Sequence, residues 1–220
     1  LFKGQEFRFQ RGYGSYVMEN VLFKISFPAE FHAQTAVECA MQLHPEVSQR
    51  LDDIEKITIE TQEAGARIID KTGPLDNYAD RDHCIQYMVA VPLMFGELTA
   101  NSYNDDVAAD PRIDALRERM EVSENERFTT DYFDPEKRGI GNAVQVFFRD
   151  GSSTERIEVS YPIGHRRRRD EGIPVLVNKF RSAMGNHYGA DQAAGIESAC
   201  SDQEGLELTP VPDFVSRLVT

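Results

Sequence analysis

Hydrophobic and polar residues alternate over 21–27 and change to a helical spacing from residue 29 onward. One side of the alternating part is apolar, which predicts an extended segment: Val21, Phe23, Ile25 and Phe27. Pro28 ends this segment and can open a helix, because the N–H that proline lacks would be unpaired in a first turn. The helical spacing predicts a helix over 29–46 with one face formed by His32, Ala36, Cys39, Ala40 and Leu43.

Short strands and helices follow along the rest of the chain. Alternation predicts strands at 56–63 and 121–124 and a hairpin with arms at 143–150 and 153–162. Helical spacing predicts helices at 80–95, 111–120, 173–189, 190–202 and 211–219. The polar segment 128–142 is predicted as a loop. Because a hairpin and runs of helix replace repeated βαβ units, we expect an α+β fold with an antiparallel sheet and flanking helices.

The balance of charge and the cysteines exclude several classes of protein. A net charge of −13 argues against nucleic acid as a partner, since phosphate binding needs a clustered cationic surface. No apolar run approaches the roughly 20 residues that span a bilayer, and no secretory signal pattern opens the chain. Cys39, Cys84 and Cys200 lie far apart, without iron–sulfur or zinc spacing. We therefore expect a cytoplasmic protein with reduced thiols, without a metal or other cofactor and without contact to a membrane.

Lys24 and His32 lie close enough along the chain to converge on one site. Burial among Phe23, Ile25 and Phe27 would lower the pKa of Lys24 and favour a neutral amine that accepts a proton. A charged Lys24 would instead anchor an anionic substrate. In the structural alternative, Lys24 extends its ammonium to water and His32 is a hydrogen-bonded residue at the edge of the core.

Arg81, His83 and Tyr87 form a second candidate group. His83 and Tyr87 are four residues apart, so a continuous helix would place them on one face. A phenol can donate to a carboxylate or protonate a leaving hydroxide, and an imidazole titrates near neutrality. Arg81 can bind a carboxylate with two parallel hydrogen bonds, or it can be an exposed arginine at the start of the helix. The basic run Arg166 to Arg169 can attract an anion, contact an acidic partner surface or form a solvated loop.

Several long segments resemble the MmgE/PrpD superfamily, which holds dehydratases of 2-methylcitrate and decarboxylases of cis-aconitate. The first is GSYVMENVLFKISFPAEFHAQTAVECA, and the others are at 70–96, 108–122 and 160–174. The resemblance implies that the chain is the C-terminal portion of such a protein. Residues 1–20 would connect to a missing N-terminal helical domain, and residues 21–164 would be the small α+β domain. Residues 165–220 would be C-terminal helices that belong to the mainly helical domain.

The resemblance also implies roles for single residues. A superfamily motif has a lysine before a Phe/Tyr–Pro pair and a histidine in the following helix, and Lys24, Phe27, Pro28 and His32 match it. A second histidine that is common two positions later is Gln34 here. The superfamily also has a tyrosine in the form of Tyr87 with Ala90. We expect Lys24 and Tyr87 to be catalytic, and His32, His83 and Arg81 to bind substrate.

The resemblance implies as the reaction the removal of water from a small tricarboxylate, 2-methylcitrate, by acid–base side chains in a homodimer. A related superfamily enzyme, such as a decarboxylase, is the first alternative. The second is a non-catalytic pairing module, because further acid–base residues of the superfamily lie in its N-terminal domain. On that ground we expect little activity from residues 1–220 alone.

Overall fold

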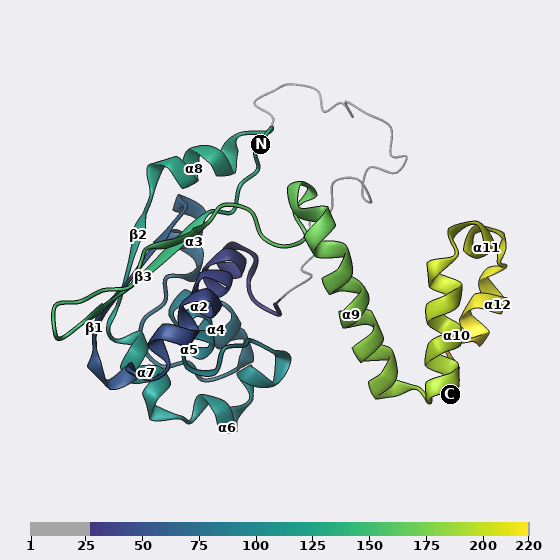
Figure 1. The fold of residues 1–220 in the computed structure, drawn as a ribbon, viewed down its shortest axis with the longest axis horizontal. Coiled ribbons are helices and arrows are strands. Elements are labelled where there is room, and N and C mark those ends of the chain that lie inside the picture. The colour runs from purple at the N-terminus through teal and green to yellow at the C-terminus, as the bar shows by residue number, and fades with distance from the viewer. Residues whose placement is uncertain (1–26, 220) are drawn as a thin grey trace, which may run out of the picture.

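The computed structural model describes residues 27–219 and contains one sheet (Figure 1). Lys24, the predicted extended segment before Phe27 and the predicted connection at 1–20 lie outside the described residues. The sheet has four strands in the order β2-β1-β3-β4. Their bounds are β1 (Ile54–Thr61), β2 (Met120–Glu124), β3 (Asn142–Phe148) and β4 (Ile157–Val159).

Two of the three strand pairs are antiparallel, which confirms the predicted α+β class. β3 pairs antiparallel with both β1 and β4. β1 and β2 run parallel, so the chain between them must cross back over the sheet. This crossover contains the helices α3 (Glu63–Ile69), α4 (Tyr78–Asp82), α5 (Ile85–Phe95), η3 (Ala100–Tyr103), α6 (Asp105–Ala108) and α7 (Pro111–Arg117).

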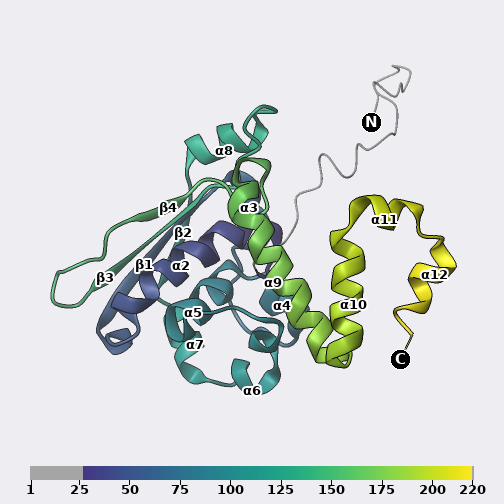
Figure 2. The ribbon, with the colours of Figure 1, turned by 45° about the vertical axis from the view of Figure 1, so that its right-hand side comes forward.

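Helices cover one face of the sheet and enclose the core there (Figures 1 and 2). The helix α2 (Gln34–Val47) packs against β3, β4 and α5, and α7 packs against α5. Alternate residues of β1 point into this layer, and Ile57, Ile59 and Thr61 are fully buried. The predicted amphipathic strand is thereby confirmed, because its polar residues Thr58 and Glu60 stay partly exposed on the other face.

The predicted helix at 29–46 is confirmed, with a different beginning. Pro28 does not open it; a single turn, η1 (Phe31–Ala33), comes first and leads directly into α2. The Glu30 carboxylate accepts a hydrogen bond from the backbone N–H of His32 and so caps the turn. All five residues of the predicted apolar face, from His32 to Leu43, are buried.

The prediction of one helix over 80–95 is wrong, because the chain breaks at His83 and Cys84. His83 is the C-terminal cap of α4, and Cys84 is extended with φ −122° and ψ 107°. The two parts differ in their surroundings, which explains the break. Most of α4 is polar and accessible to solvent, whereas every residue of α5 except Phe95 is buried. A helix that is apolar all round has to be enclosed, so it cannot continue in the direction of α4.

The prediction of a loop over 128–142 is also wrong in its first half. The helix α8 (Glu126–Phe133) begins just before this segment and occupies it as far as Phe133, and the Asn125 side chain caps the helix by accepting from the backbone N–H of Arg127. Phe128 anchors the helix, since it is buried in the domain. A Cβ on Gly141 would lie 2.5 Å from the Phe128 ring, so the glycine makes room for this anchor.

The chain ends in a series of helices that extends away from the sheet (Figures 1 and 2). They are η4 (Arg166–Arg168), α9 (Arg169–His187), α10 (Ala190–Ser201), α11 (Gln203–Leu208) and α12 (Val211–Ser216). A fourth single turn, η2 (Leu51–Asp53), precedes β1. The predicted division of the chain into domains at residue 164 stays a prediction. Within residues 27–219, no helix has both the length and the apolar character to cross a membrane.

Candidate functional site

Buried polar side chains fix the backbone where α2 begins. The Gln34 amide donates to the carbonyl oxygens of Phe27 and Ala29, each at 2.9 Å. The Asn142 amide donates to the carbonyl of His32 and to the Thr35 hydroxyl, each at 2.7 Å. Because all three polar side chains are almost fully buried and bonded, they hold the chain around His32 in one conformation.

His32 lies between a carboxylate and a phenol. Its Nδ1 is 3.0 and 3.1 Å from the two oxygens of Glu30, and its Nε2 is 3.3 Å from the Tyr132 hydroxyl. The His32 and Tyr132 rings also contact each other, with centroids 5.6 Å apart. We call Glu30, His32 and Tyr132 the His32 relay. His32 is only 9% exposed, so this hydrogen-bonded imidazole is largely shielded from solvent.

The charge of Glu30 fixes the orientation of the imidazole. Burial alone would raise the pKa of Glu30, but hydrogen bonds and charge from His32 outweigh it and hold this pKa below its usual value. Glu30 is therefore ionised near neutrality and accepts at both oxygens, so Nδ1 of His32 carries a proton toward it. Nε2 then accepts a hydrogen bond from the Tyr132 hydroxyl when the imidazole is neutral, and donates one to it when the imidazole is protonated. Such a chain can accept or deliver a proton at the phenol end.

Sequence reasoning identified His32 and missed its two partners. Tyr132 belongs to α8, in a segment predicted as a loop, and it is 100 residues away from His32 along the chain. Glu30 is two residues before His32 and caps the turn by accepting from the His32 backbone N–H. A glutamate two residues before a histidine is only a weak sequence signal for such a cap. The cap at Asn125 was the signal that could have placed Tyr132 on a helix.

The structure brings His83 near the His32 relay and leaves it accessible to solvent. The backbone N–H of Glu30 donates to the carbonyl of Asp82 at 3.2 Å, so the end of α4 lies beside η1. His83 is 54% exposed at its side chain, and its Nδ1 is 2.6 Å from the Asp82 carboxylate. The predicted shared face with Tyr87 is wrong, because Tyr87 belongs to the next helix and is buried.

Tyr87 and Arg81 converge on η3. The Tyr87 hydroxyl donates to the carbonyl of Ser102 at 2.6 Å, and its ring stacks on Tyr103. Burial raises the pKa of Tyr87 to about 12, so the phenol stays protonated. Arg81 is buried, in contrast to the exposed alternative, and donates to the carbonyl of Tyr103 at 2.6 Å and to Asp105 at 2.7 Å. The catalytic and binding roles expected for these two residues stay predictions, as does that of Lys24 outside the described residues.

The structure predicts a measurable cost for removing the Tyr87 hydroxyl. The substitution Tyr87→Phe leaves the Ser102 carbonyl without its donor inside the core, so the free energy of unfolding should fall by about 1–2 kcal/mol. Urea denaturation of wild type and variant measures the difference. An unchanged denaturation midpoint would show that the hydrogen bond contributes nothing net.

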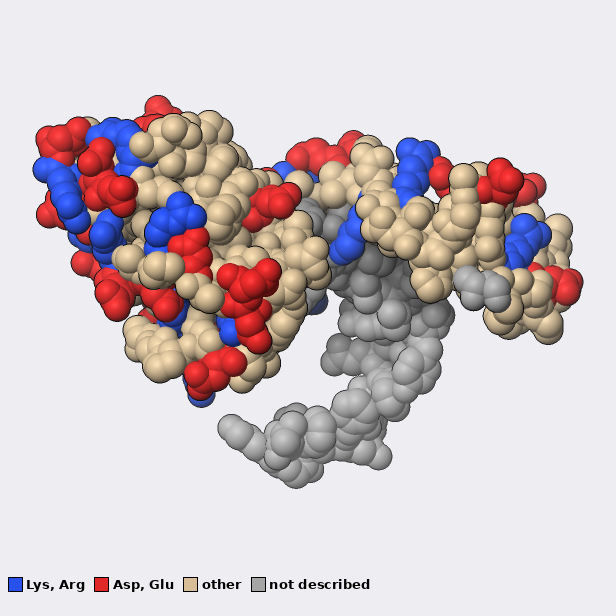
Figure 3. Space-filling view, turned by 90° about the horizontal axis from the view of Figure 1, so that it is seen from below, with Lys and Arg blue, Asp and Glu red and all other residues tan. Residues whose placement is uncertain are grey.

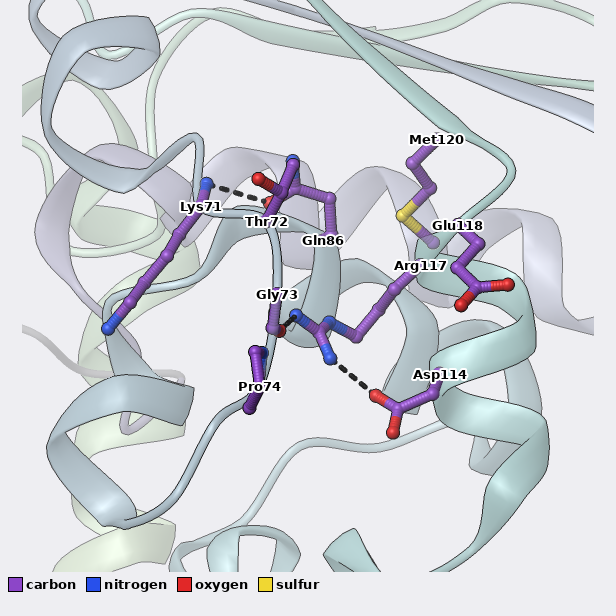
Figure 4. Close-up of a pocket in the computed structure, with 9 residues that line it drawn as sticks. All are labelled: Lys71, Thr72, Gly73, Pro74, Gln86, Asp114, Arg117, Glu118 and Met120. Carbon is purple, nitrogen blue, oxygen red and sulfur yellow. Dashed lines mark hydrogen bonds and ion pairs between the residues drawn. The ribbon is translucent and has the colours of Figure 1, made fainter.

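A pocket of about 500 Å³ opens between α5, α7 and the 71–74 turn, apart from the His32 relay (Figure 4). Its two cationic side chains, Arg117 and Lys71, are already paired with carboxylates of the chain. Arg117 donates to the carbonyl of Gly73 at 2.8 Å and pairs with Asp114. Figure 4 shows the Lys71 amine pointing away from Arg117, and this amine pairs with Asp80. The pocket therefore has less free positive charge for an anion than its two cationic residues indicate.

The basic run at 166–169 fixes the beginning of α9. Arg168 donates to both oxygens of Glu38 on α2, at 2.8 and 2.9 Å, and to the carbonyl of Tyr161 at 2.7 Å. Arg166 and Arg167 both donate to the carbonyl of Glu136. On the face shown in Figure 3, acidic and basic side chains are interspersed rather than separated into patches. These contacts give the run a role inside the chain, which none of the three alternatives for it contained.

The buried His165 next to this run makes the stability depend on pH. Burial, and then the charges of nearby arginines, lower the pKa of His165 below its ordinary value of 6.5. Below about pH 6.5 the unfolded chain therefore binds a proton that the folded chain does not, so stability falls as the pH falls through the folded-state pKa. The free energy of unfolding should decrease from pH 7.5 to pH 5, and less steeply in His165→Gln. Equal slopes would contradict this assignment.

Comparison with known proteins agrees with this architecture. The model of the MmgE/PrpD C-terminal domain matches residues 27–203, so the chain belongs to this family. The chain is 61% identical to the "2-methylcitrate dehydratase, mitochondrial" of Yarrowia lipolytica, over 90% of this chain and 39% of that protein. It is 58% identical to the "2-methylcitrate dehydratase" of Salmonella typhimurium, over 99% of this chain and 46% of that protein.

A more distant relative carries a similar name. It is the "2-methylcitrate dehydratase-like protein oryR" of Aspergillus oryzae, which is 41% identical over the whole of this chain and 45% of its own length. The chain thus spans less than half the length of the curated relatives that it matches. The predicted family is confirmed.

Proposed function

We propose that the protein containing this chain is a 2-methylcitrate dehydratase, which converts 2-methylcitrate to 2-methyl-cis-aconitate and water in propionate catabolism. One observation carries the proposal: relatives that bear this name are 57–61% identical across 90% or more of the chain. The geometry supports it, since the His32 relay offers a proton-transfer group at the edge of the domain.

The reaction needs groups that move two protons. A base removes the proton from the carbon next to a carboxylate, the electron pair forms the C=C bond, and the hydroxyl leaves as water after it is protonated. His32 can exchange a proton through Tyr132, while the ionised Glu30 stabilises the protonated imidazole. We propose that side chains carry the whole elimination without a metal.

The test uses the intact protein, expressed from its natural reading frame, after exhaustive chelation. Absorbance of the conjugated product should appear on addition of 2-methylcitrate. Loss of activity on chelation, restored by a metal, would overturn the metal-free mechanism. Turnover of another tricarboxylate in place of 2-methylcitrate, or release of carbon dioxide, would assign the protein to another activity of its superfamily.

Residues 1–220 by themselves should have little activity, because the relatives are more than twice as long. The same assay on this chain and on the intact protein makes the comparison. Turnover by the chain at the rate of the intact protein would show that the part of the protein outside residues 1–220 is not needed for catalysis.

We also propose that the intact protein is a cytoplasmic homodimer with a small tricarboxylate as its partner. The resemblance to the superfamily supports the dimer, and the three free cysteines are compatible with a reducing compartment. Light scattering at micromolar concentration tests the dimer, and fractionation of the source cells tests the compartment.

A further inference from the structure

A second, smaller pocket opens beside Tyr132. It has a volume of about 330 Å³ and lies between η1, α8 and the loop that joins α8 to β3. Its lining is mainly apolar, with one phenol and one guanidinium: Phe31, Tyr132, Phe133, Pro135, Arg138 and Ile140. We call it the α8 pocket. An apolar wall with two polar groups is the usual composition of a site for a small organic molecule.

Arg138 has a backbone conformation that favours glycine. Its φ is +49°, and it is the one non-glycine residue with positive φ between Phe27 and Val219. The turn after α8 imposes this conformation, because the N–H of Arg138 donates to the carbonyl of Asp134 at 2.8 Å and that of Gly139 to Asp131 at 2.9 Å. A glycine would adopt this turn without strain, so folding gives no reason for an arginine.

The Arg138 guanidinium makes one hydrogen bond with the part of the chain that the structure describes. Its Nε donates to the carbonyl of Pro135 at 3.2 Å. Its two terminal nitrogens make no hydrogen bond or ion pair with any residue of the described chain. A guanidinium with both terminal nitrogens open can hold a carboxylate by charge and by directed hydrogen bonds.

The Tyr132 hydroxyl supplies a second donor, because the His32 relay holds it in place. When His32 carries protons on both ring nitrogens, Nε2 donates to the phenol oxygen, and the O–H of Tyr132 is left to donate to a ligand. The apolar side chains Phe31, Phe133 and Ile140 suit the carbon atoms next to a carboxylate. A single guanidinium matches one carboxylate better than a dianionic phosphate, since the rest of the pocket is uncharged.

We propose that the α8 pocket binds one carboxylate group of the substrate through Arg138 and Tyr132. The inference rests on the proposed function, because it takes the ligand to be the tricarboxylate that the protein dehydrates. Arg138 is then a binding residue, and Tyr132 contacts this carboxylate with the same phenol that ends the His32 relay. The pocket would hold the substrate next to the group that moves its proton.

The decisive variant is Arg138→Gly in the intact protein. It removes the guanidinium and also relieves the backbone strain, so KM for 2-methylcitrate should rise roughly tenfold or more while the melting temperature stays equal or rises. A merely structural arginine would give the opposite pattern, a lower melting temperature with the same KM. Arg138→Lys, which keeps the charge, should recover part of the loss.

Two further variants complete the test. Tyr132→Phe should also raise KM, because it removes the second donor. Arg149→Gln is the matched control, because it also removes one positive charge from an exposed arginine. Arg149 follows β3 at the hairpin turn, and this turn lies at the end of the sheet away from α8 (Figure 1). Its KM should stay at the wild-type value.

The outcomes distinguish failure of the carboxylate subsite from failure of the proposed function. If wild type turns over 2-methylcitrate and Arg138→Gly keeps its KM, the carboxylate subsite is overturned and the activity stands. If Arg149→Gln raises KM as much as Arg138→Gly, the effect is a general one of charge and the subsite is overturned as well. If wild type turns over no tricarboxylate, the proposed function fails, and the substrate named for the pocket fails with it.

Discussion

The substitution His32→Ala is expected to lower kcat/KM of the intact protein on 2-methylcitrate by a factor of about 100 or more. A positioned acid–base group typically contributes a factor of ~10²–10⁴ to a rate. His32 is the residue through which the ionised Glu30 and the Tyr132 phenol are connected, so its removal interrupts the relay. Steady-state assays of wild type and variant measure the ratio, and circular dichroism verifies that the variant folds.

The control for this substitution is His187→Ala. His187 is exposed near the end of α9, and its ring contacts the neighbouring Tyr188. Its loss should leave kcat/KM almost unchanged. Glu30→Gln should have an intermediate effect and shift the pH profile of kcat/KM, because an amide orients the imidazole without stabilising its charge. A folded His32→Ala protein with wild-type kcat/KM would remove the relay from the mechanism.

The substitution Arg168→Met is expected to lower the free energy of unfolding by about 3 kcal/mol. Breaking a buried ion pair from one side costs ~3–5 kcal/mol, because the other charge is left without compensation. Arg168 and Glu38 are 18% and 14% exposed at their side chains, so the lower end of this range applies. The hydrogen bonds that Arg168 donates to Glu38, and then to Glu171, raise the pKa of Arg168 further, so the guanidinium is always charged.

An exposed ion pair in the same group of helices gives the comparison. Arg181 pairs with Glu197 at 2.6 Å, but their side chains are 55% and 31% exposed. Arg181→Met should therefore change the unfolding free energy by less than about 1 kcal/mol. Urea denaturation of both variants, together with Glu38→Gln and the double variant, gives the coupling energy of the Arg168–Glu38 pair. Equal effects of Arg168→Met and Arg181→Met would contradict the role given to burial.

Much of the fold follows from local patterns in the sequence. The strands β1 and β3 and the buried face of α2 were predicted from periodicity, because each buries one side and leaves the other partly exposed. The pairing of β3 with β4 was predicted from the hairpin pattern, although all three residues of β4 are half-buried. The break at His83 and Cys84 was not predicted. Its cause is the enclosure of α5 by α2 and α7, which acts over long sequence distances that a helical pattern does not contain.

The candidate site was predictable only in part, for a related reason. His32 could be identified from its place at the start of an amphipathic helix. Tyr132 reaches it from α8, and Asn142 reaches its carbonyl from β3, so both contacts depend on how the sheet pairs. The direction of β2 was equally hidden, since a single strand of five residues carries no signal for a parallel partner.

The placement of the cysteines makes this chain suitable for site-selective labelling. Cys39 and Cys84 are buried, and burial raises the pKa of Cys39 to about 12, so its reactive thiolate is scarce at neutral pH. Cys200 is exposed on α10. A maleimide dye at pH 7 should therefore react at Cys200 alone, without removal of the other thiols. A fluorophore there would report when the C-terminal helices become covered as the intact protein assembles.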